Sequence, residues 1–426
     1  MEEALSLHLG PEGEDWRVPV SELQHRQQQL AVRLAELNLP GVLVQHPIDL
    51  YYFTGGRQDS TFFLPAKGAP GSIDAGGDGP IAFVRRSLRR ARFEAGESDA
   101  PHQIESFGRL SLFTERLQKA GVIEKPALQY GEIPTSFSRR FERALNSLDG
   151  DFSDATGIIH EMRETKSTWE LEQMAVGAEI QRRMFDAIET IGCEGMSELD
   201  LVAAAEAISR SEGFGGNVQM RRYPLQCDRG VIVAGRAGGV PSFFDSAIGG
   251  EGPHPLSGMG AGFNTVKRNE PVLVDLVHVH RGYVVDATRM FVAGRLHSIW
   301  EERLDDMLTV KNTVIDVLDA GETCSQAWRE GYEVATELGH AEHLMGMAPD
   351  QSRFLGHSVG LQLDESPVIA EGFDRPLPIG GVMAIEPKVV HPDGSIGSED
   401  TWVRTENGLQ PITADVELPW LIEWAQ

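Results

Sequence analysis

The sequence predicts two domains: an α/β domain over residues 1–158, and an α+β domain over residues 159–426 that contains an internal pseudo-twofold repeat. Three observations predict this organisation. The chain has 426 residues, which is more than one ordinary core accommodates. Short apolar runs alternate with helical patterns up to about residue 157, as in α/β domains. Beyond that point, a pattern of two successive helices followed by strands occurs twice.

The first domain is expected to alternate helices and strands. After a loose arm over residues 1–20, leucines at helical spacing predict a helix over residues 21–37. The Gly-, Pro- and Asp-rich stretch 67–79 is typical of a loop between strands. The other elements expected here are a strand at 41–45, a strand running into a glycine turn at 48–56, a strand at 81–86, and helices near 86–95 and 110–120.

The second domain is expected to be built from two similar halves. A charged helical stretch, residues 160–188, leads into it. Gly195 then opens a helix that ends at Gly213, and Gly321 opens another that ends at Gly339, so the two spacings are the same. The matching lengths and the longer helix in front of each predict a pseudo-twofold arrangement of the domain.

Charge and cysteine usage exclude several classes of partner. The chain carries 38 basic and 64 acidic residues, a formal charge of −26. Since phosphate binding requires a basic surface, we expect neither nucleic acid nor an anionic membrane as a partner. The cysteines, Cys193, Cys227 and Cys324, form no C-x-x-C pair and indicate neither a disulfide framework nor a thiolate zinc site. The N-terminal residues are acidic and polar, and no apolar run approaches roughly 18 residues, so we expect a cytoplasmic protein.

Two carboxylates lie within apolar segments of the second domain. Asp275 and Asp286 are eleven residues apart in the stretch 271–291, whose pattern predicts two strands of one hairpin. A buried ionised carboxylate is costly unless it is paired, hydrogen-bonded or bound to a metal. Two of them on neighbouring strands therefore predict a shared cation.

Three further candidate ligands follow in the chain. His357 lies between a glycine and a strand-like segment, while Glu386 and Glu399 lie in apolar segments on either side of the turn Asp393-Gly394. Together with the two aspartates they form a set of mostly hard oxygen ligands with one imidazole. Such a set suits two divalent ions of manganese, iron, cobalt or zinc, roughly 3.5–4 Å apart.

These five positions, with their spacing and flanking residues, resemble the pita-bread metallopeptidase family, which includes methionine aminopeptidase, aminopeptidase P, prolidase and creatinase. The resemblance covers residues 160–415, and the small first domain resembles the one carried by aminopeptidase P, prolidase and creatinase. It implies a homodimeric, metal-dependent hydrolase of the Xaa-Pro peptidase branch, which acts on a small peptide.

The resemblance also implies a role for each ligand. Asp275 would chelate one ion, and Asp286 and Glu399 would bridge it to a second ion. His357 and Glu386 would hold that second ion. The ions would lower the pKa of a bound water from that of bulk water towards about 7 and would polarise the scissile carbonyl. Glu386 is the candidate for general acid and base.

The chain departs from the family pattern around the substrate. Asp364 stands where the family's peptidases carry a second histidine, and a carboxylate donates no hydrogen bond to a carbonyl unless it is protonated. Asp364 is therefore expected to receive a cationic group or to act as an acid or base. Arg353 replaces a histidine of aminopeptidase P, Val277 a usual glycine, and Gly397 an arginine of the proline-specific members. We therefore expect an altered substrate pocket with Asp364 and Arg353 among its contacts.

Three other histidines need a role or a structural explanation. His254 lies in the small-residue loop 235–262, close to where prolidase-like members keep a substrate-contacting histidine, and it is expected to donate to the substrate or to the tetrahedral intermediate. A solvated loop histidine is the alternative. His278 and His280 alternate out of phase with Asp275 on the strand, so we expect packing or surface positions for them.

Two other functional readings remain open. A lyase or C–N hydrolase acting on a small charged metabolite would account for Asp364, and the family's dimethylsulfoniopropionate lyases keep a metal site. A catalytically inactive domain that binds peptides would be expected to have lost its ligands, whereas this chain keeps all five.

Overall fold

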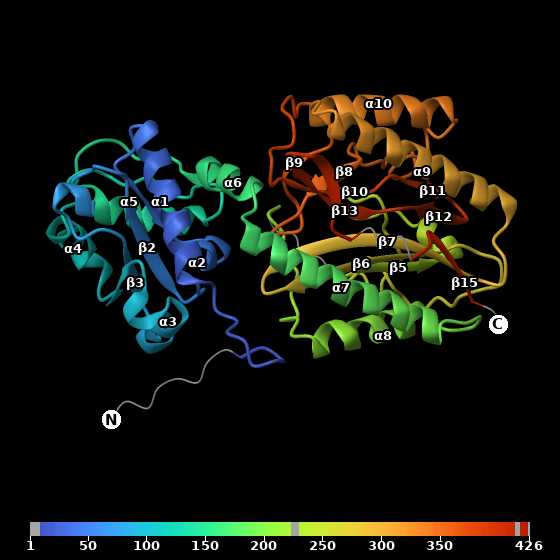
Figure 1. Cartoon of the computed structure of the whole chain (residues 1–426), viewed down its shortest axis with the longest axis horizontal. Coiled ribbons are helices and arrows are strands. Elements are labelled where there is room, and N and C mark those ends of the chain that lie inside the picture. Colours follow the sequence, from blue (N-terminus) through green and yellow to red (C-terminus); the bar gives the residue numbers. More distant parts are fainter. Residues whose placement is uncertain (1–8, 223–229, 414–417, 425–426) are drawn as a thin grey trace. The chain divides into compact units, whose positions relative to one another are not determined.

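The computed structural model describes residues 9–222, 230–413 and 418–424. The chain divides into two compact units, Met1–Met162 and Arg163–Gln426, whose helices and strands are labelled in Figure 1. The boundary predicted at residue 158 stays a prediction. Cys227 lies outside the described residues.

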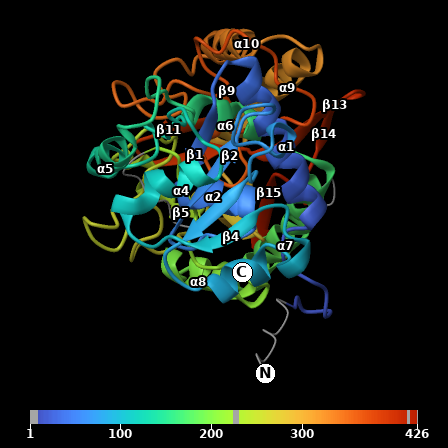
Figure 2. The same cartoon turned by 90° about the vertical axis from the view of Figure 1, so that its left-hand side faces the viewer.

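The first unit contains a mixed sheet in the order β1-β2-β3-β4, in which β1, β2 and β3 are antiparallel neighbours and β4 is parallel to β3. Helix α1 packs against β1 and β2 (Figure 2). A cluster of buried phenylalanines fills the core on the face that carries Phe63 and Phe83. The bounds are β1 (Gly41–Val44), β2 (Ser60–Pro65), β3 (Ile81–Val84), β4 (Gln103–Ser106), α1 (Val20–Glu36), α2 (Pro47–Thr54), α3 (Leu88–Glu94), α4 (Phe113–Lys119), α5 (Thr135–Leu145), α6 (Thr156–Glu164), and the 3₁₀ turns η1 (Ile73–Ala75), η2 (Glu97–Asp99) and η3 (Leu110–Leu112).

The strand predicted at residues 48–56 is wrong, because this segment forms helix α2. Pro47 lies in the first turn, where its fixed φ suits a helix start and its missing N–H costs nothing. Gly55 ends the helix with φ of 76°, and its N–H bonds to the carbonyl of Tyr51. The helix is buried on most of its surface, so its apolar run lacked the periodicity that would have distinguished helix from strand.

The second unit places two layers of helices around its strands (Figure 1). Helices α7 and α8 pack on one face of the sheet β15-β7-β6-β5. Helices α9 and α10 pack with the opposite face and with the strands that follow them. The bounds are α7 (Thr168–Ile191), α8 (Glu198–Ser211), α9 (Ser298–Asp319), α10 (Cys324–Glu337), η4 (Gly235–Gly239), β5 (Gly230–Ala234), β6 (Val272–His280), β7 (Tyr283–Ala293), β8 (Gly356–Ser358), β9 (Glu365–Val368), β10 (Val382–Ile385), β11 (Lys388–His391), β12 (Gly394–Gly397), β13 (Asp400–Thr405), β14 (Gly408–Pro411) and β15 (Leu421–Trp424).

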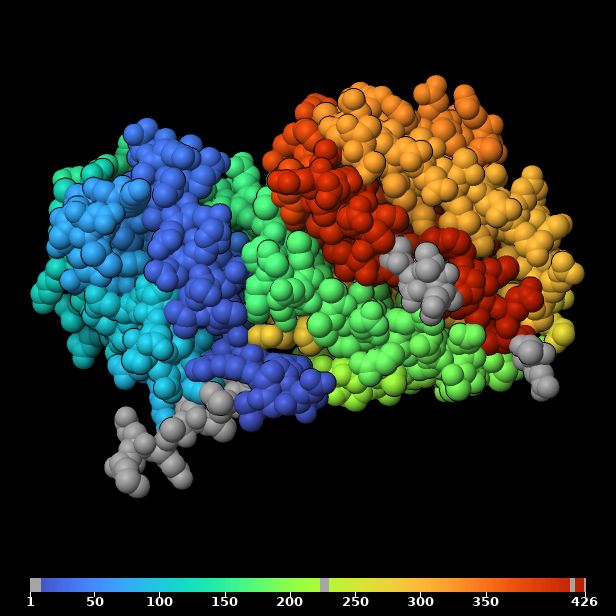
Figure 3. All heavy atoms as spheres, in the orientation of Figure 1, coloured from blue at the N-terminus to red at the C-terminus, as the bar shows by residue number. Residues whose placement is uncertain are grey.

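The two halves expected from the sequence are present as matched helix pairs. Helices α7 and α9 have 24 and 22 residues, and α8 and α10 have 14 residues each. Ser197 and Thr323 cap the shorter helices in the same way, with a side-chain oxygen that accepts a backbone N–H three residues on. One face of α7 is exposed (green in Figure 3), whereas Met184 and Phe185 on its other face enter the core. None of the described helices is long and apolar enough to span a membrane.

Candidate metal centre

The hairpin β6–β7 places both predicted aspartates on one face. Asp275 pairs with Thr288, and Val277 pairs with Asp286, so these four side chains point the same way on neighbouring strands. The connecting turn has φ of 50° and 99° at its two central positions, Arg281 and Gly282, as a two-residue hairpin with the right twist requires. The sheet therefore brings the two carboxylates together.

The opposite face of β6 carries the two histidines that alternate out of phase with Asp275. His278 is buried, and its Nδ1 lies 2.9 Å from the hydroxyl of Ser209 on α8. Burial lowers the pKa of His278 to about 3, so the ring is neutral. His280 is also buried. The prediction that these histidines serve packing is confirmed.

The other three predicted ligands come from the second sheet and from the short ribbon β11–β12. His357 on β8 pairs with Ala384 on β10, next to the end of that strand. Glu386 follows β10, and Glu399 precedes β13, the antiparallel partner of β10. Both glutamates therefore lie where the sheet passes into the ribbon, and the antiparallel arrangement predicted from the Asp393-Gly394 turn is confirmed.

The five predicted ligands converge on one place. One ligand atom each from Asp286, His357 and Glu399 lie within 4.8 Å of one another. His357 Nε2 is 3.3 Å from Glu386 Oε1. Asp275 joins the cluster through a shared contact with a lysine ammonium. Three strands and two connections between strands thus assemble the set that the sequence spacing predicted.

The lysine at this cluster, Lys388, was missed in the sequence. Its Nζ donates to Asp275 Oδ2 at 3.0 Å, to Glu386 Oε2 at 2.7 Å and to Glu399 Oε2 at 2.8 Å. The side chain is 1% exposed. A lysine inside the apolar run AIEPKVV, between two expected glutamate ligands, was a signal that could have identified it.

The electrostatics of the centre are dominated by an excess of buried negative charge. Burial, reinforced by Glu399 and Asp275, raises the pKa of Asp286 well above its ordinary value. Burial also raises the pKa of Glu399 to about 8, against the opposing effect of Lys388. The protein alone therefore supplies too little positive charge to stabilise the ionised forms of Asp286 and Glu399.

Glu386 differs because cationic groups surround it. Burial alone would raise its pKa, but Lys388 and then His357 lower the pKa of Glu386 to about 2. Burial likewise opposes the charged form of His357, yet its contact with Glu386 raises the pKa of His357 to about 9. Burial would lower the pKa of Lys388, whereas the surrounding carboxylates, Asp275 first, raise it well above its ordinary value.

These donors fit a divalent metal ion. Asp286 Oδ1 and Glu399 Oε1 are buried and have no hydrogen-bond partner among the described residues. A buried carboxylate oxygen without a donor is costly, and a cation removes that cost. The oxygens lie next to the imidazole of His357, and such a mixed set of carboxylate and imidazole suits manganese, iron, cobalt or zinc.

A layer of polar groups beneath the centre holds Glu399 in place. Thr288 Oγ1 donates to Glu399 Oε2 at 2.8 Å. Arg289, which is 1% exposed, donates to the Glu399 carbonyl and forms an ion pair with Asp400 Oδ1 at 2.9 Å. The second oxygen of Asp400 lies 3.3 Å from Lys311 Nζ. These residues fix the glutamate backbone and one carboxylate oxygen from below.

The centre lines a cavity of about 450 Å³. Arg353 also lines it, is exposed, and forms no ion pair with any described residue. Val277 and Phe244 contribute apolar surface to it. His254 is exposed and is not among the described residues that line the cavity, so the structure does not bring it to the centre. Its predicted contact with the substrate stays a prediction.

Asp364 lines the cavity but has partners within the protein. Its Oδ1 accepts the backbone N–H of Arg221 at 2.5 Å, and its Oδ2 accepts the backbone N–H of Arg222 at 3.0 Å. The carboxylate therefore fixes the segment that forms one wall of the cavity. A cationic group of a substrate would have to share these oxygens with the two backbone N–H groups. The contacts of Asp364 therefore support a role in positioning the cavity wall more directly than a role in binding a cation.

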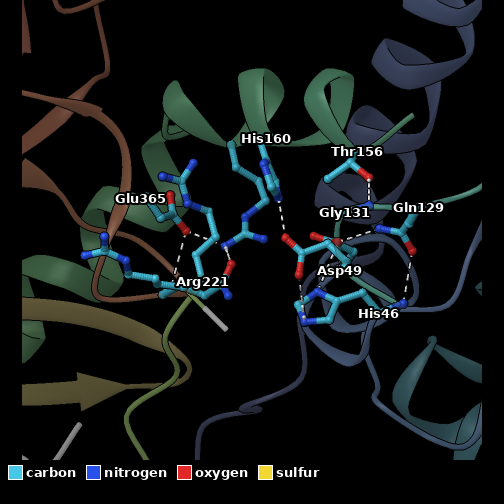
Figure 4. A network of polar contacts seen from close by, with 12 residues as sticks. His46, Asp49, Gln129, Gly131, Thr156, His160, Arg221 and Glu365 are labelled. Carbon is cyan, nitrogen blue, oxygen red and sulfur yellow. Dashed lines mark hydrogen bonds and ion pairs between the residues drawn. The ribbon is translucent and has the colours of Figure 1, made fainter. Parts of the chain in front are cut away.

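The neighbouring Glu365 is buried in a separate ion-pair network (Figure 4). Its two oxygens accept hydrogen bonds from Arg163 and Lys166, which are themselves buried. Burial alone would raise the pKa of Glu365, but these two cations lower it to about 2. Glu365 thus fixes the start of β9 and, with it, the adjacent Asp364.

The sequence of this chain matches two protein-family models. The model of Metallopeptidase family M24 matches residues 172–406, and that of the Creatinase/Prolidase N-terminal domain matches residues 26–165. Among curated relatives, an Xaa-Pro dipeptidase of Pyrococcus furiosus is 23% identical over 92% of this chain and 98% of its own length. An Xaa-Pro dipeptidase of Lactobacillus delbrueckii subsp. lactis is 28% identical over 62% of this chain and 64% of its own length.

Solved structures share the fold of the whole chain. The X-Pro aminopeptidase of Thermotoga maritima superimposes with a TM-score of 0.73 and 20% identity, covering 92% of this chain and 99% of that one. The Xaa-Pro dipeptidase of Bacillus anthracis gives a TM-score of 0.74 with 18% identity, covering 95% of this chain and all of that one. The predicted α/β domain and the pita-bread domain are therefore confirmed.

Proposed function

Because the chain belongs to metallopeptidase family M24, we propose that it is a metal-dependent peptidase that hydrolyses short Xaa-Pro peptides. The observation that carries this proposal is the convergence of the predicted ligands at the cavity, where Asp286, His357 and Glu399 meet. The Xaa-Pro dipeptidases among its relatives supply the substrate class.

The roles proposed for the ligands follow from their contacts. Asp286, His357, Glu386 and Glu399 would hold a divalent ion, and Asp275 lies beside them, bound to Lys388. A bound ion would lower the pKa of a water molecule and polarise the scissile carbonyl. The carboxylate of Glu386 would take up a proton and return it to the leaving amine, since it faces both His357 and the cavity. The sequence predicts two ions.

The cavity suits a small peptide with a free carboxylate. Its volume of about 450 Å³ lies in the range of ordinary small-molecule sites. Arg353 is a cation at the cavity without an ion pair among the described residues, and guanidinium groups bind carboxylates through paired hydrogen bonds. We assign Arg353 to the C-terminal carboxylate of a dipeptide. A cytoplasmic location, a homodimer and manganese as the native metal stay predictions of the sequence.

The proposed function is tested by hydrolysis of a peptide panel with added Mn²⁺. We expect cleavage of Leu-Pro, with slower cleavage of Leu-Ala and of Leu-Pro amide, because the amide lacks the charge that Arg353 would bind. Arg353→Ala is expected to raise KM for Leu-Pro by about tenfold while leaving KM for the amide unchanged, since one charge-assisted hydrogen bond contributes about 1.5–3 kcal/mol.

The same panel includes Leu-Pro-Ala and dimethylsulfoniopropionate. Cleavage of the tripeptide in preference to the dipeptide would favour an aminopeptidase over a dipeptidase. Conversion of dimethylsulfoniopropionate without peptide cleavage would replace the peptidase by the lyase alternative. Inactivity towards the whole panel, in protein shown to contain metal, would contradict the proposal.

A further inference from the structure

We propose that the ammonium of Lys388 takes the place of one of the two divalent ions, so that this centre binds a single ion with Lys388 as its second cation. The proposal rests on the proposed function, because it concerns the metal centre of that activity. It is carried by the three hydrogen bonds of Lys388 and by the oxygens that these bonds leave available.

The backbone and the side chain of Lys388 are both held in place by the fold. It is the first residue of β11, pairs with Gly397 on β12, and is 1% exposed. An ammonium has three N–H groups, and here each of them points to a carboxylate oxygen, at 3.0, 2.7 and 2.8 Å. The side chain is therefore fully satisfied by this site, and leaving it would place an unpaired ammonium in the core.

The ammonium contacts two of the carboxylates expected at the first ion, Asp275 and Glu399, and it also contacts Glu386, which was expected at the second. Asp275 is expected to chelate the first ion and Glu399 to bridge it, and here both accept a hydrogen bond from the ammonium of Lys388. A metal binds carboxylate oxygens at about 2.0–2.2 Å, whereas the ammonium stands 2.8–3.0 Å from these two. A divalent ion and the ammonium of Lys388 therefore cannot occupy the same position between these oxygens.

The remaining oxygens define the place of the ion that stays. Glu386 Oε2 and Glu399 Oε2 each accept a hydrogen bond from Lys388 Nζ. Glu386 Oε1 lies 3.3 Å from His357 Nε2, and Glu399 Oε1 is buried without a partner among the described residues, as is Asp286 Oδ1. In each glutamate, Oε2 binds Lys388 and Oε1 remains for the metal ion. His357 and Asp286 complete the ligands of that ion.

The balance of charge agrees with one ion. The four carboxylates at the centre carry four negative charges when ionised, and Lys388 carries one positive charge. One divalent ion would leave the centre with a single negative charge. A second divalent ion would give this buried centre one positive charge unless an anion such as hydroxide bound with it.

The segment around Lys388 leaves no room for a side chain at position 397. A Cβ added to Gly397 would lie 2.6 Å from Lys388 Cγ and 2.5 Å from the carbonyl oxygen of Pro387. The backbone at Pro387 and Lys388, together with the stem of Lys388, therefore fills the space that an arginine at position 397 would need.

The test counts bound ions and does not depend on activity. Chelator-treated protein is titrated with Mn²⁺ in a calorimeter, and the metal retained after dialysis is measured. We expect one ion per chain for the wild type and for Lys388→Arg, which keeps a cation, and two ions per chain for Lys388→Ala. Lys267→Ala removes an exposed lysine of the same unit and is the control for net charge, with one ion expected.

Asp275→Asn gives a second test that does not require Lys388→Ala to fold. We expect this variant to keep its one ion with an affinity within about tenfold of the wild type, because Asp275 contacts Lys388 rather than the ion. Two ions in the wild type, one ion in folded Lys388→Ala, or no ion in folded Asp275→Asn would each overturn the inference. A two-ion wild type that cleaves Leu-Pro contradicts this inference alone, whereas a one-ion wild type without peptidase activity contradicts the proposed function alone.

Discussion

Replacing Asp286 by asparagine is expected to abolish metal binding while leaving the metal-free protein at least as stable as the wild type. Loss of an outer hydrogen bond around a metal typically costs 10–100-fold in affinity, so loss of a ligand should cost more than about 100-fold. The metal-free protein should not suffer, because burial and neighbouring carboxylates already disfavour the charge of Asp286, as its raised pKa shows. Calorimetric titration with Mn²⁺ and urea denaturation of the chelated protein measure the two effects.

Thr288→Val is the matched control for this experiment. It removes the hydroxyl that donates to Glu399 Oε2 but keeps the shape of the side chain and every ligand. We expect a loss of affinity of about 10–100-fold, smaller than that of Asp286→Asn. If Asp286→Asn kept wild-type affinity, or lost no more affinity than Thr288→Val, Asp286 would not be a ligand.

Replacing Asp400 by asparagine is expected to destabilise the protein by about 3–5 kcal/mol, because it leaves two buried cations without a counter-charge. Asp400 has no exposed surface, and its two oxygens lie 2.9 Å from Arg289 Nη2 and 3.3 Å from Lys311 Nζ. The substitution changes the shape of the side chain very little, so the loss of stability measures the effect of removing the negative charge. The free energy of unfolding in urea measures it.

The exposed ion pair between Arg329 and Glu371 provides the comparison. These side chains are 49% and 68% exposed and 3.2 Å apart. Glu371→Gln is expected to change the free energy of unfolding by no more than about 1 kcal/mol, as is usual for surface pairs. Equal effects of Glu371→Gln and Asp400→Asn would show that the buried network is not a stabilising unit.

The ligands could be predicted from the sequence because a carboxylate in an apolar segment is costly to bury unless a cation or a hydrogen bond compensates it. Asp275 and Asp286 interrupt strands that are otherwise apolar, and their spacing follows from the hairpin that holds them. The ligand glutamates lie on either side of a turn with a strong local signal. Strand pairing and alternation place Asp275 and Asp286 on one face of the hairpin, whereas the approach of the second sheet, which carries the other donors, does not follow from local rules.

The features that were missed depend on packing that the sequence pattern does not contain. Lys388 was overlooked because a lysine in a strand is ordinarily exposed, and only the fold shows that its ammonium reaches three carboxylates. The segment 48–56 was assigned as a strand because its apolar run has no helical period; burial on most sides of α2 removes that period. The backbone partners of Asp364 come from residues 221 and 222, far away in the sequence.

Metal dependence is tested most directly by the hydrolysis of Leu-Pro by wild-type protein before and after removal of its metal. We expect chelation to abolish hydrolysis and Mn²⁺ to restore it, since the donors around Asp286 and Glu399 are arranged for a divalent ion. Undiminished hydrolysis by protein measured to be free of metal would contradict it.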